Sequence, residues 1–124
     1  MRARLVALAM FVLAGGSGAM ADEAKRGEAL FQSCRSCHSL DPGRPGMAGP
    51  PLDGLAGRLL GSAWGFDYSP GFRQARAQGL RWDAERLEAY LADPDSIVPG
   101  GWMSPPGGLS DADRAAMAVF LLER

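Results

Sequence analysis

Two cysteines and the single histidine of the chain stand close together as Cys34, Cys37 and His38. This is the pattern C-x-x-C-H, in which both thiols bond covalently to the vinyl groups of a haem and the following imidazole becomes an axial ligand of its iron. The two intervening residues let one turn of chain reach both vinyl groups, so that the next residue lies beneath the iron. The motif therefore predicts one haem c attached through Cys34 and Cys37, with His38 as a metal ligand.

A redox-active pair or a structural disulfide fits the two cysteines less well. A thioredoxin-like redox pair belongs in a strand-helix context, for which the sequence gives no pattern. A disulfide between residues three apart would close a very small loop and remove little entropy from the unfolded chain. A chance match is the remaining alternative. Haem attachment is preferred because two independent features agree with it. The N-terminus is typical of an export signal, and the predicted helices have too little apolar surface to form a core without a ligand.

The sixth position of the iron needs a further ligand or stays open. Thioethers suit haem iron and raise its reduction potential, and three of the six methionines lie in an N-terminal export segment. Met117 falls on the apolar stripe of a predicted helix, and Met47 is only nine residues from His38. Met103 stands 65 residues beyond His38 in an irregular loop, where a side chain can be aimed at a ligand. From spacing alone, Met103 is equally well explained as adaptable packing.

The first 21 residues are typical of a secretory signal. They contain Arg2 and Arg4, an apolar run over residues 5–14, and the small-x-small site Ala19-Met20-Ala21. An uncleaved membrane anchor is the alternative, but a spanning helix needs about 20 apolar residues. We therefore expect residues 1–21 to be a cleaved signal peptide, residues 22–124 to form one domain, and the mature protein to reside in the periplasm without permanent membrane insertion.

Composition limits the possible functions. The chain of 124 residues is 47% hydrophobic and carries a formal charge of −1, which suits one small domain. The chain has no excess of basic residues, so the release of counterions cannot drive its binding to nucleic acid. The 17 glycines and 9 prolines predict that much of the fold is loop.

Four short helices are expected, and no strand pair or internal repeat is apparent. They cover residues 22–33, a segment from Ser69-Pro70 to Gly79, a segment capped by Asp83 and ended by Pro94, and a last helix that starts at Ser110 with Asp113. Residues 39–64 and 95–109 are expected as loops. These helices carry too little apolar surface to close a core alone. The predicted fold is therefore all-α, with long Gly/Pro loops wrapped around one covalently bound haem.

The ordered motifs resemble those of one family over nearly the whole of residues 22–124. Besides the C-x-x-C-H motif they are Gly49-Pro50-Pro51-Leu52-Asp53-Gly54, Gly57-Arg58, Gly65-Phe66-Asp67-Tyr68-Ser69, Trp82-Asp83, Tyr90-Leu91, Asp93-Pro94 and Val98-Pro99-Gly100-Gly101-Trp102-Met103. The chain resembles the small class I cytochromes c, particularly the bacterial cytochrome c2 and mitochondrial-like branch.

This resemblance implies roles for individual residues. Met103 would be the distal iron ligand, and the carbonyl of Pro50 would accept a hydrogen bond from the ring of the haem histidine. Arg58, Tyr68 and Trp82 match positions that hydrogen-bond the haem propionates, although Trp82 is alternatively plain core. Tyr90 matches a tyrosine near the axial sulfur. The positions that match the close crossing of the first and last helices are Gly27, Phe31 and Phe120.

The chain also departs from the family pattern. Gly101 stands where a threonine often bonds a propionate, and Asp95, Ser96 and Trp102 occupy positions that are often lysines. These departures put in doubt the ring of basic side chains at which partners of the family usually dock. Scattered arginines either replace part of that ring or are simply solvated; they are Arg35, Arg44, Arg73 and Arg76. Trp102 is either an exposed docking residue or packs against the haem edge.

The resemblance implies a non-enzymatic one-electron carrier. Its partners would be redox proteins that dock transiently at the haem edge, and it would have no small-molecule substrate. A dedicated electron-accepting haem subunit of a periplasmic dehydrogenase is the alternative. A haem sensor or peroxidase ranks last, because no second histidine is present for acid-base work.

Overall fold

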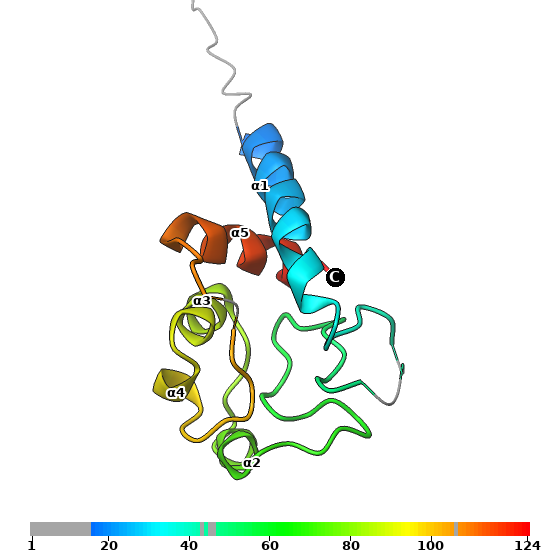
Figure 1. The fold of residues 1–124 in the computed structure, drawn as a ribbon, viewed down its shortest axis with the longest axis vertical. Helices are drawn as coiled ribbons and strands as arrows, with labels where there is room; N and C mark the ends of the chain where they lie inside the picture. Colours follow the sequence, from blue (N-terminus) through cyan, green and yellow to red (C-terminus); the bar gives the residue numbers. More distant parts are fainter. Residues whose placement is uncertain (1–15, 43, 45–46, 106) are drawn as a thin grey trace, which may run out of the picture.

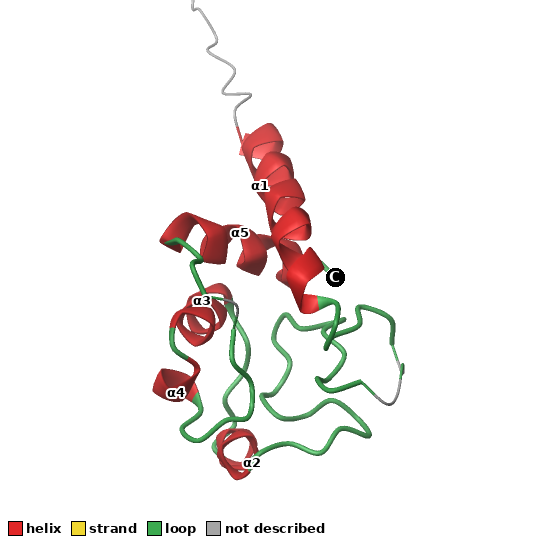
Figure 2. Cartoon of the chain, viewed as in Figure 1, coloured by secondary structure: helices red, strands yellow, loops and turns green. Residues whose placement is uncertain are grey.

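The computed structural model describes residues 16–42, 44, 47–105 and 107–124, and this part of the chain consists of helices and loops (Figures 1 and 2). The helices are α1 Gly16–Phe31, α2 Pro70–Ala77, α3 Ala84–Ala92, α4 Pro94–Ile97 and α5 Asp111–Leu122, with a 3-10 turn at Gln32–Cys34. The predicted all-α class is confirmed. Within the described residues the only strand-like feature is an isolated bridge between Leu59 and Arg81.

Three helices begin at the predicted capping residues. The Ser69 side chain accepts a hydrogen bond from the backbone N–H of Phe72 at the start of α2, which has a proline in its first turn. At the start of α3, the Asp83 carboxylate accepts a hydrogen bond from the backbone N–H of Arg86. At α5, Ser110 and Asp113 form a reciprocal capping box.

The start of α1 and the presence of α4 differ from the prediction. α1 begins at Gly16 rather than at Asp22; Ala19, Met20 and Ala21 are strong helix formers that extend it before Asp22. The sequence pattern does not predict α4, because Pro94 reads as the end of α3. The fixed φ of proline also suits the first position of a helix, and the N–H of Val98 donates to the Pro94 carbonyl to close one turn.

Helices α1 and α5 cross closely, as Figure 1 shows. A Cβ at Gly27 would lie 2.1 Å from the carbonyl oxygen of Ala116, so only glycine allows this approach. Next to the crossing, the rings of Phe31 and Phe120 lie 5.6 Å apart between centroids. The predicted crossing of the first and last helices is therefore confirmed.

The long loop after the cysteine motif is tied to the segment before α3. The N–H of Gly57 donates to the Trp82 carbonyl, and the N–H of Trp82 donates to the Arg58 carbonyl, both at 2.9 Å. A further bond joins Leu60 to Leu80 at 2.8 Å. These bonds satisfy backbone groups that no helix provides for and fix the loop beside the core.

The described helices are each too short or too polar to cross a membrane. The apolar run over residues 5–14, on which the export prediction rests, lies outside the described residues.

Ser110→Ala should lower the free energy of unfolding by about 1 kcal/mol, because α5 loses the side chain that caps its first turn. Urea denaturation at neutral pH measures this, and Ser110→Asn should restore most of the loss. Hydrogen bonds from Ser110 hold the pKa of Asp113 below its usual value. The contribution of the Asp113 carboxylate is thus complete above its unfolded pKa and is lost as the pH falls through the folded one. Equal stability of Ser110→Ala and the parent at neutral pH would contradict the capping role.

Candidate functional site

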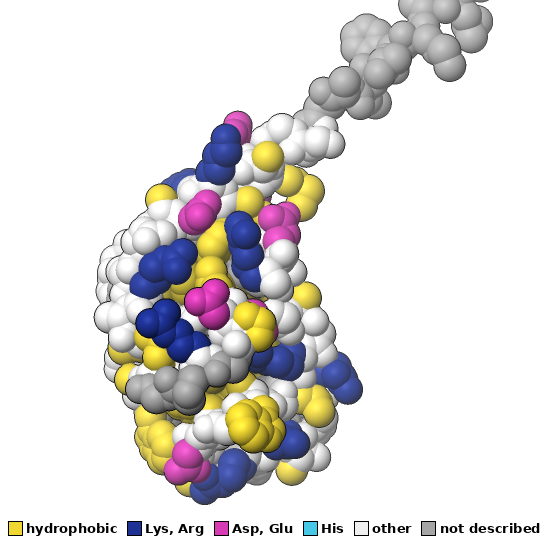
Figure 3. Space-filling model, turned by 90° about the vertical axis from the view of Figure 1, so that its right-hand side faces the viewer, with side chains coloured by type: hydrophobic (Ala, Val, Ile, Leu, Met, Phe, Trp, Pro, Cys, Tyr) yellow, Lys and Arg dark blue, Asp and Glu magenta, His cyan; other side chains and the backbone are white. Residues whose placement is uncertain are grey.

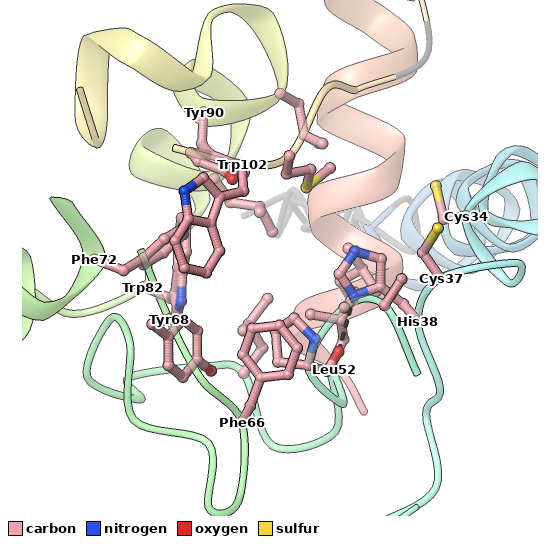
Figure 4. A pocket seen from close by; sticks show the side chains of 18 of the residues that line it. Cys34, Cys37, His38, Leu52, Phe66, Tyr68, Phe72, Trp82, Tyr90 and Trp102 are labelled. Atoms are coloured by element: carbon pink, nitrogen blue, oxygen red, sulfur yellow. Dashed lines mark hydrogen bonds between the residues drawn. The ribbon is translucent and has the colours of Figure 1, made fainter. Parts of the chain in front are cut away.

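A cavity of about 430 Å³ lies between the cysteine motif, the long loop, α3 and α5. Cys34, Cys37 and His38 stand on one side of it, and an aromatic wall that includes Tyr68 and Trp82 stands on the other (Figure 4). Most lining side chains are apolar, and the few polar groups come from separate elements. This arrangement suits a large apolar ligand that carries a few polar groups.

The cysteine motif forms a single turn at the end of α1. The N–H groups of Cys37 and His38 both donate to the carbonyl of Cys34, at 3.1 and 3.0 Å. Both cysteines are free, and Figure 4 shows their sulfur atoms close to each other near the cavity. Burial raises the pKa of the Cys34 thiol, against an opposing hydrogen bond from Ser33 and with a smaller contribution from Cys37. The turn thus presents two thiols and one imidazole to the same space.

The His38 ring is buried and held in one orientation. It is 8% exposed, and its Nδ1 lies 2.8 Å from the carbonyl oxygen of Pro50. Because a carbonyl only accepts, Nδ1 carries the proton and Nε2 keeps a free lone pair for a metal. Burial lowers the pKa of His38, while the Pro50 contact acts in the opposite direction. The site therefore favours the neutral imidazole that ligation requires.

Arg58 brings a charged group to the cavity wall. Its two terminal nitrogens donate to the carbonyls of Asp53 and Pro51, at 2.9 and 3.0 Å. Its buried Nε makes no hydrogen bond with any described residue. A buried N–H without an acceptor is rare in folded proteins. This observation fits a ligand with a carboxylate, such as a haem propionate.

The aromatic wall is a continuous set of ring contacts. Phe72 lies 5.3 Å from Tyr68, 6.4 Å from Trp82 and 5.8 Å from Tyr90, between ring centroids. The Tyr68 hydroxyl accepts a hydrogen bond from the N–H of Ala63, which leaves its own proton to donate. Burial, with a smaller contribution from Asp95, raises the pKa of Tyr90 to about 12. Both phenols thus remain protonated donors at neutral pH.

Two methionines line the cavity together with His38. Met103 comes from the loop after α4 and is half-buried against the core, whereas Met117 comes from α5 and is 1% exposed. Met47 is not among the lining residues. The structure thus brings His38 and Met103 to one cavity, and places Met117 in the core that the sequence predicted for it.

Comparison with known proteins identifies this architecture. The Cytochrome c family model matches residues 24–124. The chain belongs to the cytochrome c family. It is 32% identical to cytochrome c-554 of Methylosinus trichosporium over 117 residues, which cover 94% of this chain and 86% of that one. With cytochrome c2 of Rhodoblastus acidophilus it shares 37% identity over 95 residues, 77% of this chain and 86% of the other.

A solved structure gives the same result for the fold. Ferricytochrome c2 of Rhodopseudomonas palustris superposes with a TM-score of 0.68 at 33% sequence identity, covering 79% of this chain and 95% of that chain. This cytochrome therefore falls in the class I cytochrome c2 branch, as predicted. It binds one covalent haem c through Cys34 and Cys37, and it is a monohaem electron carrier.

Two features of the cytochrome site were not found from the sequence. A Cβ at Gly49 would lie 2.4 Å from Cε1 of His38, so this glycine leaves the space that the imidazole fills. Its only signal was its place directly before Pro50. The second feature is that Arg58 holds the carbonyl of Pro51, next to the residue that accepts from His38. Such side chain to backbone contacts leave no pattern in a single sequence.

Trp102 lies at the cavity and is also exposed, so both alternatives that the sequence left open for it, docking and packing against the haem edge, stay open. It lines the cavity, as Figure 4 shows, and is nevertheless 67% exposed. The side chain thus stands where the cavity meets the surface of the cytochrome.

Proposed function

We propose that this cytochrome is a periplasmic one-electron carrier whose iron is ligated by His38 and Met103. The observation that carries the proposal is that a buried imidazole with its Nδ1 engaged lines the same cavity as a loop methionine. When bound, the haem supplies the reversible one-electron change between ferric and ferrous iron. Every other requirement falls on the protein, which must hold both ligands and exclude water.

The neighbouring residues tune this change. Pro50 fixes the orientation and basicity of the histidine ligand through its carbonyl. The free Nε–H of Arg58 and the hydroxyl of Tyr68 are the proposed donors to the propionates, and Trp82 completes that wall. Tyr90, whose hydroxyl stays protonated, is proposed to lie near the sulfur atom of Met103. The largely apolar cavity favours the less charged ferrous site, in the same direction as the thioether ligand.

Export and cleavage after Ala21 are part of the proposal. Residues 16–21 at the start of α1 are all exposed, so their removal breaks no buried contact of the domain. The mass of the haem-loaded protein from a periplasmic extract tests this, and a chain that begins at Asp22 is expected. A mass that retains residues 1–21 would favour the membrane-anchor alternative.

The visible spectrum of the purified protein, oxidised and reduced, tests the ligand pair. We expect a covalent haem that shows the methionine-sulfur band when oxidised and ignores carbon monoxide when reduced, because both axial positions are filled. Rapid carbon monoxide binding would overturn the closed-carrier proposal and favour a sensor or enzyme.

A dedicated subunit of a dehydrogenase is the second candidate. The observation in its favour is two strongly exposed tryptophans, Trp64 at 94% and Trp102 at 67% exposure. Gel filtration of a native periplasmic extract separates the candidates, since a subunit elutes with its enzyme and a free carrier elutes alone.

A further inference from the structure

The rim of the haem cavity is uncharged. The lining residues that are also exposed are Ser33, Ser36, Cys37, Ala48, Trp102 and Ser104, and these six define the cavity rim. None carries a charge once the Cys37 thiol is consumed by haem attachment. An incoming redox protein that approaches the haem meets hydroxyls, a methyl group and an indole.

The charges that flank the cavity rim do not share a sign. Arg35 stands in sequence between Ser33 and Ser36, and its guanidinium lies over the Phe31 ring, 5.3 Å from the centroid. Asp95 accepts a hydrogen bond from the N–H of Gly100, which ties a negative charge to the Trp102 loop. Figure 3 shows basic and acidic side chains interspersed with hydrophobic ones over one side of the molecule. Such a surface provides little electrostatic steering.

Trp102 provides a large exposed apolar surface at the cavity rim. A large aromatic side chain that is two-thirds exposed beside a functional opening is typical of the centre of a protein interface. Met103, the next residue, is partly buried against the core and lines the same cavity, so Trp102 belongs to a segment that packs at the cavity rim.

We propose that the cavity rim docks a redox protein whose own surface around its cofactor is uncharged and apolar, with Trp102 in the contact. This inference rests on the proposed electron-carrier function. In the step itself one electron leaves the ferrous haem, which becomes ferric, and reduces the oxidised cofactor of the partner; no bond forms and no proton moves. The docking is expected to be short-lived because no charge pairs hold it, and to depend on salt only through the net charges of the two proteins.

A second molecule of this protein in the opposite oxidation state is a partner of that chemistry. The probe is therefore electron self-exchange in mixtures of ferric and ferrous protein, measured by NMR line broadening. Between low and high ionic strength, at about 10 and 500 mM salt, the rate constant is expected to rise only as far as screening the repulsion between two net negative molecules requires, since removal of Arg2 and Arg4 with the signal leaves 11 basic and 14 acidic residues. A rise well beyond that net-charge effect, or a fall as salt is raised, would overturn the uncharged rim as the docking surface.

Paired lysine substitutions show whether Trp102 is in the contact. In a symmetric contact Trp102→Lys brings like charges together, so exchange should fall at least about tenfold at low salt and recover at high salt. Trp64→Lys is the matched control, because it makes the same change of net charge at an exposed tryptophan outside the cavity lining. Trp102→Phe should keep most of the rate. Equal effects of the Trp102→Lys and Trp64→Lys variants would overturn the proposal.

A readout without electron transfer separates docking from redox function. In the fully ferrous protein, raising the concentration should shift the NMR signal of the Trp102 indole N–H and leave that of Trp64 in place. A shift of the Trp64 signal alone would overturn the proposal. If the spectrum and the reversible reduction by a small titrant are normal while exchange depends on salt well beyond the net-charge effect, only the docking inference fails. If the haem itself is not reversibly reduced, the carrier function fails first.

Discussion

Met103→Ala is expected to open one axial position of the haem iron and lower the reduction potential. The thioether is the ligand that favours ferrous iron, and alanine cannot replace it. The fall should be on the order of 0.1–0.3 V, inside the roughly 0.8 V that axial ligands span. The oxidised variant should lose the methionine-sulfur band, and the reduced variant should bind carbon monoxide. Potentiometric titration with visible spectra measures all of these.

The second lining methionine provides the control for this prediction. Met117→Leu conserves volume in the core of α5 and should cost less than about 1.5 kcal/mol of stability. Its spectrum and potential should stay close to those of the parent protein. If Met117→Leu removes the sulfur band while Met103→Ala leaves it, the ligand assignment is wrong and Met117 takes the role.

Gly49→Ala is expected to displace His38, the proposed iron ligand. The added Cβ would lie 2.4 Å from Cε1 and 2.7 Å from Nδ1 of His38, so either the ring or the loop must move. Overpacking of this kind typically costs 1–3 kcal/mol, about the range expected here. Movement of the ring also strains its 2.8 Å contact with the Pro50 carbonyl. We expect a lower yield of haem-loaded protein and a shifted potential in whatever folds.

Gly107→Ala is the matched control, because a Cβ there meets nothing within 4 Å. Its thermal unfolding and potential should match those of the parent. An unchanged potential and stability in Gly49→Ala would show that the loop yields easily, and that the position of the imidazole does not depend on this glycine.

The sequence predicted the parts of the fold that rest on local rules. Ser69, Asp83 and Ser110 cap their helices because short polar side chains at those positions satisfy free N–H groups. α4 was missed because one proline served two helices in succession, ending α3 and starting the next turn.

The candidate site was predictable where a motif fixes the chemistry. Cys34, Cys37 and His38 follow from their spacing, and the contact of His38 with the Pro50 carbonyl followed from resemblance. The packing of Gly49 against His38 depends on how a loop folds back on the motif, which no local pattern reveals. The exposure of Trp102 likewise depends on the course of its loop.

The crossing of α1 and α5 has a consequence for the order in which the parts of the chain can fold. Gly27 and Ala116 are separated by most of the chain, so their contact closes a very long loop and cannot form before both segments have been delivered. The cysteine motif lies on the early side of that loop, directly after α1. In a chain that is made from its N-terminus, the thiols of this motif are therefore accessible before α5 can pack against α1 and close this side of the structure.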